Sequence, residues 1–289
     1  MTMVHREEAY LALWLKHYEP MFGRENLYIL THGGDPRIVE MAAGCRLVYL
    51  PRLSVDGRFN INRFGLLNAY ANFLVAQYDG VVAGDVDELV FVDPALGISF
   101  TDFAEEHRKS AEVLWVFGLN LFERRGDGPL EEGKPVLAQR RHARCEHDYC
   151  KPLVVFKNPE WTVGYHSAMA TPVLPTGLYM VHLHHFSRAL TEQIAEQRQE
   201  TLAENPQILD SRAFRKRWWG QRMGLSRQYL KNMSAKPVED LDDRIDDLLA
   251  HLRSHVVQSR WGGRGYQQMV FEEKPDFTLR LPERFAQVI

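Results

Sequence analysis

Three carboxylates follow a short apolar stretch in the run Val81-Val-Ala-Gly-Asp85-Val-Asp87-Glu88. The apolar stretch is typical of a buried strand, and open parallel sheets bind their ligands beyond the carboxyl ends of the strands. In an extended chain, residues two apart point to the same side, so Asp85 and Asp87 should face one ligand and Glu88 should point away. Carboxylates suit Mg²⁺ and Mn²⁺ and leave coordination positions open for phosphate oxygens. The spacing therefore predicts that Asp85 and Asp87 share one cation.

Two other interpretations of these acids remain open. They could form a plain acidic loop at a strand end, because two aspartates at this spacing also occur by chance. Aspartate-nucleophile phosphohydrolases also carry D-x-D-x-T/V after a buried strand, although the fifth residue here is Leu89. The sequence contains no G-x-G-x-x-G, no P-loop and no G-x-S-x-G, and therefore no motif of dinucleotide, P-loop or hydrolase-elbow sites.

The elements that must position the acids alternate between helical and extended patterns. Apolar residues recur at helical spacing over 8–18 and 61–78, and a shorter helix can open at Pro36 and close at Gly44. Short apolar stretches predict strands at 27–31, 46–50, 80–84, 112–119, 152–157 and 178–184. This alternation predicts an α/β fold with a mixed, mostly parallel sheet flanked by helices.

The composition changes near residue 186. Residues 188–204 predict a polar helix, and almost no strand pattern follows before 277–281. We therefore expect an α/β core over 1–186 and a mainly helical C-terminal extension over 187–289.

The stretch from Glu7 to Pro94 resembles the glycosyltransferase family 2-like group. The resemblance rests on an amphipathic helix with a characteristic end, a strand, a turn of small residues with Asp, and Tyr-Asp before the central strand. These features are Trp14-Leu-Lys-His-Tyr18, Leu27-Tyr-Ile-Leu30, His32-Gly-Gly-Asp35, Tyr78-Asp79 and Asp85-Val-Asp-Glu88. The resemblance implies a GT-A-like, Rossmann-like fold in which a divalent cation holds the diphosphate of a nucleotide-sugar.

The resemblance also implies roles for individual residues. Asp85 and Asp87 match the motif that binds the metal and the diphosphate. His5, Arg6 and Glu7 follow a first strand at Thr2–Val4 and would receive the nucleotide base. Asp35 lies in the turn after the second strand and would meet the base or ribose. Arg63 lies near the start of the long helix and would contact a phosphate.

Histidines that follow later strands are candidates to complete the metal site, since GT-A enzymes often supply a late His as third ligand. His182 and His184 should share one face of their strand, with His185 opposite. We prefer one of these two, with His166 next. An imidazole nitrogen suits Mn²⁺ better than Mg²⁺. The alternative for each is a polar residue satisfied near the core.

The expected function is a metal-dependent glycosyltransferase that moves a sugar from a nucleotide-diphosphate sugar to an acceptor hydroxyl, in polysaccharide or glycoconjugate synthesis. The cation would act as a Lewis acid for the departing diphosphate. An inverting enzyme also needs a carboxylate base, for which Asp148 is slightly favoured over Glu146. A glycosyltransferase fold that binds carbohydrate without turnover is the non-enzymatic alternative.

Two further clusters give competing signals. The cluster His142, Cys145, His147 and Cys150 has zinc-ligand types but lacks paired C-x-x-C motifs, so a reduced loop is the preferred interpretation. Residues 211–231 are basic with interleaved aromatics and could meet a membrane surface or a phosphorylated acceptor. A solvated helix face that the acidic run 239–247 neutralises is the preferred interpretation there.

Composition narrows the class of protein. The chain has 289 residues, 45% of them hydrophobic, with 35 Lys and Arg against 38 Asp and Glu, which excludes a disordered polymer and favours a globular protein. The net charge of −3 gives no reason to expect a nucleic-acid partner. Three cysteines and the absence of a signal-like start favour the cytoplasm. Peripheral contact with the inner face of the membrane through 211–231 is the alternative to a solvated helix face. The expected partners are the sugar donor and a carbohydrate or lipid-linked acceptor.

Overall fold

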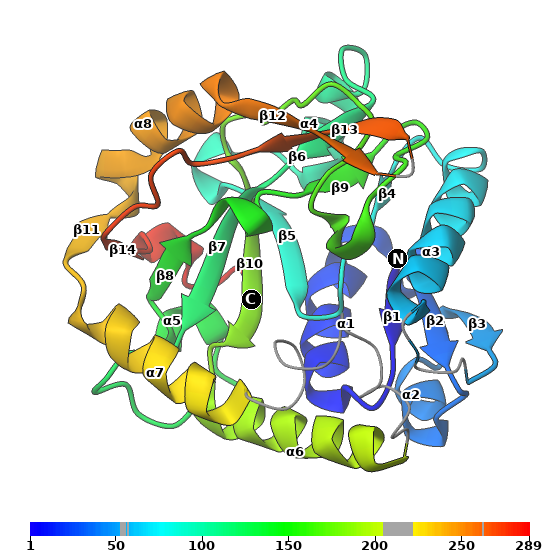
Figure 1. Cartoon of the computed structure of the whole chain (residues 1–289), viewed down its shortest axis with the longest axis horizontal. Coiled ribbons are helices and arrows are strands. Elements are labelled where there is room, and N and C mark those ends of the chain that lie inside the picture. Colours follow the sequence, from blue (N-terminus) through cyan, green and yellow to red (C-terminus); the bar gives the residue numbers. More distant parts are fainter. Residues whose placement is uncertain (53–55, 57, 205–221, 262) are drawn as a thin grey trace.

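The computed structural model describes residues 1–52, 56, 58–204, 222–261 and 263–289. It is a mixed α/β structure in which two groups of strands meet and helices cover their outer faces (Figure 1). Within these ranges, every helix is too short or too polar to cross a membrane.

The first group of strands comes mainly from the N-terminal third of the chain. Strands β1 (Thr2–Val4), β2 (Tyr28–His32) and β3 (Arg46–Leu50) are parallel, and β9 (Pro152–Val155) pairs antiparallel with β4 (Val81–Val82) and β6 (Val113–Trp115). The Met1 amine donates to Val82 O at 2.5 Å, and Gly84 N donates to Met1 O at 3.4 Å. These bonds place β1 beside β4, so the two three-stranded sheets continue each other.

The second group is a six-stranded sheet of order β11-β14-β8-β7-β10-β5. Its strands are β5 (Glu88–Val92), β7 (Phe117–Phe122), β8 (His142–Cys145), β10 (Leu178–His185), β11 (Val238–Asp240) and β14 (Thr278–Arg280). Only β10–β7 and β11–β14 pair in parallel. The expected mixed α/β character is confirmed, but the expectation that most strands pair in parallel is wrong for this sheet. Strands such as β7 and β8 are joined without a long crossover helix, and that connection permits antiparallel pairing.

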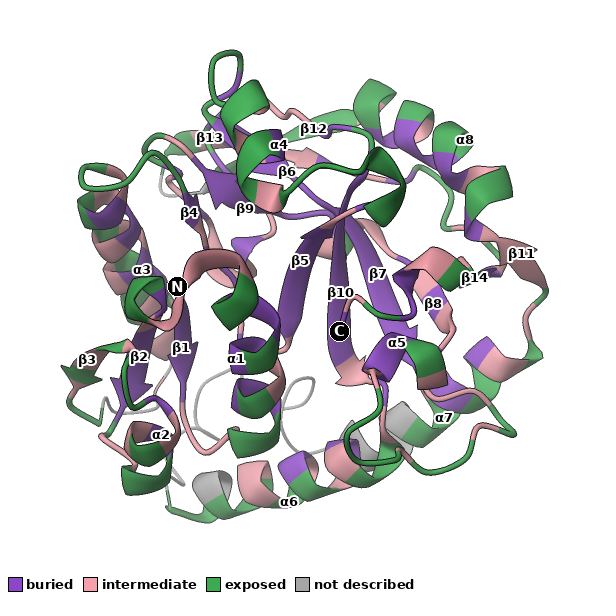
Figure 2. Cartoon of the chain, turned by 180° about the vertical axis from the view of Figure 1, so that it is seen from behind, coloured by how far each residue is buried: buried purple, intermediate pink, exposed green. Residues whose placement is uncertain are grey.

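Helices pack on these sheets much as the periodicity predicts. The helices before residue 187 are α1 (Glu8–Phe22), α2 (Pro36–Met41), α3 (Phe59–Val75), α4 (Phe100–His107) and α5 (Val136–Gln139). Short 3₁₀ turns occur at Arg24–Asn26, Pro94–Leu96, His147–Tyr149, Val163–Tyr165 and Glu283–Phe285. In α1, Leu11, Trp14 and Tyr18 are buried, and Figure 2 shows the outer face of α1 exposed while the central strands are buried. The predicted helices over 8–18 and 61–78 are confirmed.

The C-terminal part contains more strand than predicted. Its helices are α6 (Arg188–Glu204), α7 (Arg222–Ala235) and α8 (Leu241–Ser254), and β12 (Val256–Trp261) forms a hairpin with β13 (Arg264–Met269). Strands β11 and β14 extend the sheet that contains β7 and β10. The expectation of a mainly helical extension missed these strands because β11 and β14 have three residues each and the hairpin sequence is largely polar.

Candidate functional site

A cavity of about 980 Å³ opens where the two groups of strands meet. We call it the carboxyl-edge cavity because the loops after β1, β3 and β4 and the last residue of β2 reach it. Most of the residues predicted for the site line it, together with several that were not predicted. The predicted lining residues are His5, Arg6, Glu7, Arg63, Asp85, Asp87, Asp148, His166, His182 and His184. The others include His32, Arg52, Glu88, Tyr149, Lys151 and Arg198.

Asp85 and Asp87 reach the cavity through a turn and not through an extended chain. Glu88 N donates to Asp85 O at 3.0 Å and closes the turn. Alternation along a strand therefore does not apply here, and each carboxylate has its own partner. The Asp85 carboxylate accepts a hydrogen bond from the Arg63 guanidinium on α3. Burial opposes the ionisation of Asp85, but the positive charges of Arg63 and Lys151 outweigh it and lower the pKa of Asp85.

The Asp87 carboxylate faces His182, with His182 Nε2 3.3 Å from Asp87 Oδ2. Strand register places His182 opposite Glu88 on β5 and opposite Asn120 on β7. Paired residues project to the same face of a sheet, so Asn120 and His182 meet. Burial alone would raise the pKa of Asp87, but the charge of His182 and its hydrogen bond outweigh burial and lower that pKa.

The tautomer of His182 follows from the partners of Asn120. The Asn120 Nδ2 group donates to Glu146 Oε2 at 3.2 Å and to the Tyr229 hydroxyl at 2.8 Å. A carboxylate accepts only, so the amide nitrogen must lie on that side and Oδ1 must face His182. Asn120 Oδ1 therefore accepts from Nδ1–H of His182 at 2.9 Å. In a neutral ring, the Nε2 lone pair then points at the Asp87 carboxylate, and two acceptors face each other unless a positive charge lies there.

The remaining histidines take different places. His184 stacks beside His182 with ring centroids 5.8 Å apart, and both line the cavity, whereas His185 stacks on Tyr229 at 4.4 Å. His166 Nδ1 donates to Asp148 O at 2.8 Å, which leaves its Nε2 as an acceptor. Burial lowers the pKa of both His166 and His184, so these two rings stay neutral near pH 7.

A buried ion pair lies directly behind the acidic turn. The Lys151 ammonium donates to Glu88 Oε1, and their side chains are 4% and 1% exposed. The other Glu88 oxygen accepts from Asp85 N at 3.2 Å. Burial would lower the pKa of Lys151, but Glu88 and Asp85 outweigh it and raise that pKa, which keeps the ammonium charged. A side chain at Gly84 would lie 3.2 Å from the Glu88 carboxylate, so the turn leaves little room there.

The loop after β1 meets α6 across the cavity. Glu7 lies 3.7 Å from Arg198, and Glu204 lies 3.7 Å from Arg6 and 3.6 Å from Arg52. Arg6 has a φ of 55°, a left-handed conformation that costs free energy for a residue with a side chain. Burial is the main cause that raises the pKa of Glu7 to about 7. The positive charge of Arg198 opposes this rise, and the negative charges of Asp87 and Asp85 add to it. Such strained and perturbed groups are typical of functional sites.

Two predicted residues lie elsewhere. Asp35 does not line the cavity; its carboxylate accepts from Arg37 N at 2.9 Å and caps α2. Glu146 also lies outside the lining, where it contacts Asn120 and lies 3.4 Å from Arg144. Asp148 does line the cavity, and its side chain is 55% exposed.

The structure describes the zinc-type cluster and part of the basic segment. In the described ranges, no three His, Cys, Asp or Glu side chains form a group that could hold a metal ion. Cys145 and Cys150 are buried free thiols, and His147 Nδ1 accepts from Phe271 N at 3.2 Å. Residues 211–221 of the predicted basic surface lie outside the described residues. Within α7, Arg227 pairs with Glu192 at 2.8 Å and Tyr229 packs against His185.

Some site residues could have been found from the sequence. Asn120 is the one amide in the apolar run Phe117-Gly-Leu-Asn-Leu-Phe122, and a buried amide needs a partner. Lys151 directly precedes the apolar strand 152–155, which is a similar signal. Arg198 and Arg52 gave no such signal, because exposed arginines are common and only the tertiary fold brings these two to the cavity.

No protein-family model matches the chain, and no curated protein matches it. Among solved structures, the chain is similar to a mannose-1-phosphate geranyltransferase from Thermus thermophilus, with 13% sequence identity. The similarity covers 99% of this chain and 75% of that one, at a TM-score of 0.28. A TM-score this low carries neither fold nor function from that enzyme to this chain.

Proposed function

We propose that the chain is a glycosyltransferase with a GT-A-like fold that binds a nucleotide-diphosphate sugar in the carboxyl-edge cavity with the help of a divalent cation. The observation that carries the proposal is the closeness of Asp87 Oδ2 and His182 Nε2, which lie 3.3 Å apart in the cavity while Asn120 accepts from the other ring nitrogen, so that a deprotonated Nε2 could bind a cation together with Asp87. Ligands of α/β sheets bind at this edge of the strands, which supports the location.

The donor atoms fit a divalent cation. Metal-binding histidines usually donate their other ring N–H to a neighbouring acceptor, as His182 does to Asn120. One carboxylate and one imidazole leave several coordination positions for water and diphosphate oxygens, and the imidazole favours Mn²⁺ over Mg²⁺. His184 and His166 line the same cavity and are the next candidates as ligands. The bound cation would neutralise charge on the departing nucleoside diphosphate.

The other charged side chains of the cavity would each take a different part in binding or catalysis. Arg63 and Lys151 lie beside Asp85 and Glu88, where they limit the repulsion between these acids and a diphosphate. The loop His5-Arg6-Glu7 forms the wall that would receive the nucleotide, and Arg198 reaches that wall from α6. Asp148 is the candidate general base for the acceptor hydroxyl, since it is an exposed carboxylate in the cavity wall.

The phosphohydrolase alternative fits less well. A nucleophilic aspartate needs a carboxylate oxygen free to approach phosphorus. The Asp85 carboxylate is held by Arg63, and that of Asp87 faces His182.

Calorimetric titration of UDP and GDP, with and without Mn²⁺, tests the proposal. We expect Mn²⁺-dependent binding of one nucleotide to the wild type and its loss in Asp87→Asn and His182→Gln. His185→Gln is the matched control, because His185 follows on the same strand but stacks on Tyr229 outside the cavity. A nucleotide-release assay with sugar donors and acceptors then tests turnover.

Each result has a defined meaning. Full Mn²⁺-dependent binding in His182→Gln would disprove the cation site. Binding of neither nucleotide to the wild type would contradict the donor site and direct attention to phosphomonoester hydrolysis. Binding without turnover over a broad acceptor panel would favour a non-catalytic carbohydrate-binding role.

A further inference from the structure

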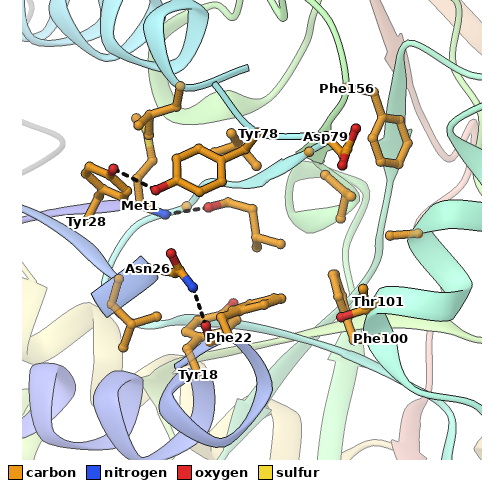
Figure 3. Close-up of a pocket in the computed structure, with 18 of the residues that line it drawn as sticks. Met1, Tyr18, Phe22, Asn26, Tyr28, Tyr78, Asp79, Phe100, Thr101 and Phe156 are labelled. Atoms are coloured by element: carbon orange, nitrogen blue, oxygen red, sulfur yellow. Dashed lines mark hydrogen bonds between the residues drawn. The ribbon is translucent and has the colours of Figure 1, made fainter. Parts of the chain in front are cut away.

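A second cavity, of about 320 Å³, lies on the other side of β1 and β4 from the acidic turn. We call it the aromatic pocket. Its walls come from the end of α1, the start of β2, the end of α3 and one face of α4. Figure 3 shows the side chains of Tyr18, Phe22, Tyr78, Phe100 and Phe156 around a common space, with Met1 at its inner end.

Apolar side chains form most of the pocket's wall, and the Met1 amine, which donates to Val82 O, lies among them. Trp14, Leu74 and Val154 complete the apolar walls together with these aromatic rings. Preformed ligand sites begin at about 300 Å³. The pocket, which is open to solvent, is therefore large enough to take a small ligand among apolar side chains.

The mouth of the pocket carries groups that can accept hydrogen bonds, and the tyrosine hydroxyls there can also donate. The hydroxyls of Tyr28 and Tyr78 are 2.9 Å apart, and the Asn26 amide nitrogen donates to Phe22 O at 2.8 Å, so its oxygen is turned toward the pocket (Figure 3). Asp79 and Glu105 also line the pocket, and Arg108 contacts both of these carboxylates. Two carboxylates against one guanidinium leave a negative rim.

We propose that the aromatic pocket binds a compact amphiphile that has an apolar ring as its body and a hydroxyl or amino group as its head. The ring would fill the space among the aromatic side chains, where flat groups gain contact area and edge-to-face packing. The head would meet the acceptors of Asn26, Tyr28 and Tyr78 and the negative rim, which attracts an ammonium through charge and through the faces of the rings. The site is separate from the donor site and does not depend on the proposed function.

Three indole probes of similar size and different charge test the site by ligand-observed NMR and calorimetry. We expect saturable binding of indole and tryptamine, and binding of indole-3-acetate roughly ten-fold weaker than that of tryptamine at low ionic strength. Ala104→Phe on α4 places a phenyl ring inside the pocket and should weaken tryptamine binding roughly ten-fold or more.

Ala250→Phe is the matched control, since it adds the same ring to an exposed position of α8 and should leave binding unchanged. Thr101→Trp, at the exposed start of α4, blocks the mouth and replaces Ala104→Phe if that variant does not fold. Absence of saturable binding for all three probes would disprove the site. Unchanged tryptamine binding in a folded Ala104→Phe or Thr101→Trp protein would disprove its location, and indole-3-acetate bound as tightly as tryptamine would disprove the head group.

Discussion

The carboxyl-edge cavity and the aromatic pocket lie on opposite sides of the same two strands and differ in almost every property. Met3 of β1 and Asp85, which follows β4, line the cavity, whereas Met1, which precedes β1, and Val82 of β4 line the pocket. Their volumes are about 980 and 320 Å³. Polar groups converge at the carboxyl ends of β1 and β4 because loops from both groups of strands meet there. At the opposite ends, the strands contact helices, which supply apolar side chains.

The two regions also differ in how their polar groups are held. In the cavity, Asp85, Asp87 and Glu88 each have a specific positive or imidazole partner, and the Glu88 pair is fully buried. In the pocket, the Met1 amine is buried and donates to Val82 O, whereas the polar side chains stand at the mouth, in contact with solvent. The removal of one partner should therefore be costly at the cavity and nearly neutral at the pocket, and the variants below test this difference.

Lys151→Met should have the largest effect, because it leaves the Glu88 carboxylate buried without its ion partner. We expect a loss of about 3–5 kcal/mol in the free energy of unfolding at pH 7, measured by urea denaturation. Burial raises the pKa of Glu88 above its usual 4.5, so the folded variant binds a proton more tightly than the unfolded chain. The loss should therefore shrink as the pH falls toward 4.5.

The double variant Lys151→Met/Glu88→Gln is the control for this prediction. A neutral amide removes the unpaired charge and should recover most of the lost stability. A single variant as stable as the wild type would show that Glu88 is neutral or solvated in the native protein.

Gly118→Ala should come next, and it measures how tightly the wall behind the cavity is packed. A Cβ atom at Gly118 would lie 2.3 Å from both the carbonyl carbon and the oxygen of Tyr149. Backbone atoms cannot move away easily, so we expect a loss of about 3 kcal/mol in stability by urea denaturation. Gly128→Ala, where nothing lies within 4 Å, should change stability little. Equal effects at the two sites would contradict the close approach.

Asn120→Ala tests the partner that orients His182. With the amide removed, the ring loses the acceptor that fixes its tautomer, and we expect Mn²⁺ affinity to fall about 10- to 100-fold in calorimetry. Glu146→Gln keeps an acceptor for the Asn120 amide and should retain most of the affinity. Unchanged affinity in Asn120→Ala would mean that His182 does not bind the cation through Nε2.

Tyr78→Phe should have the smallest effect and represents the pocket side of the comparison. It removes the hydroxyl that contacts Tyr28 at 2.9 Å, and Tyr78 is 36% exposed. Water can replace this hydrogen bond, so we expect a change within about 0.5 kcal/mol by thermal denaturation. A loss as large as that of Lys151→Met would show that the mouth is as closely interlocked as the cavity.

The spacing of apolar residues along the sequence predicted the helices and strands that depend on neighbouring residues. Helical spacing located α1 and α3, and the apolar run before Asp85 located β4 and the acidic turn. The predicted strand over 112–119 is in fact two strands, β6 and β7, which belong to different sheets. The change occurs at Val116, whose N–H donates to Lys151 O at 2.9 Å, and a partner 35 residues away leaves no local signature.

The site shows the same limit. Its acids were predicted from their spacing after an apolar strand, and its histidines from their places in later strand-like segments and from the family resemblance. Arg63 was predicted as a phosphate contact, and Lys151 was not predicted. Neither pairing, of Asp85 with Arg63 or of Glu88 with Lys151, was foreseen, since both depend on the arrangement of the two groups of strands. The shared face assumed for Asp85 and Asp87 came from strand alternation, and a turn closed by Glu88 N replaces the strand there.

The strand order has a consequence for biosynthesis. Strand β8 pairs with β7 on one side and with β14 on the other, and β14 comes more than 130 residues later in the sequence. A ribosome delivers the chain from its N-terminus, so one edge of β8 waits unpaired while the intervening segments are made. Unpaired strand edges recruit other chains, and slow translation after residue 145 should therefore favour aggregation over native protein.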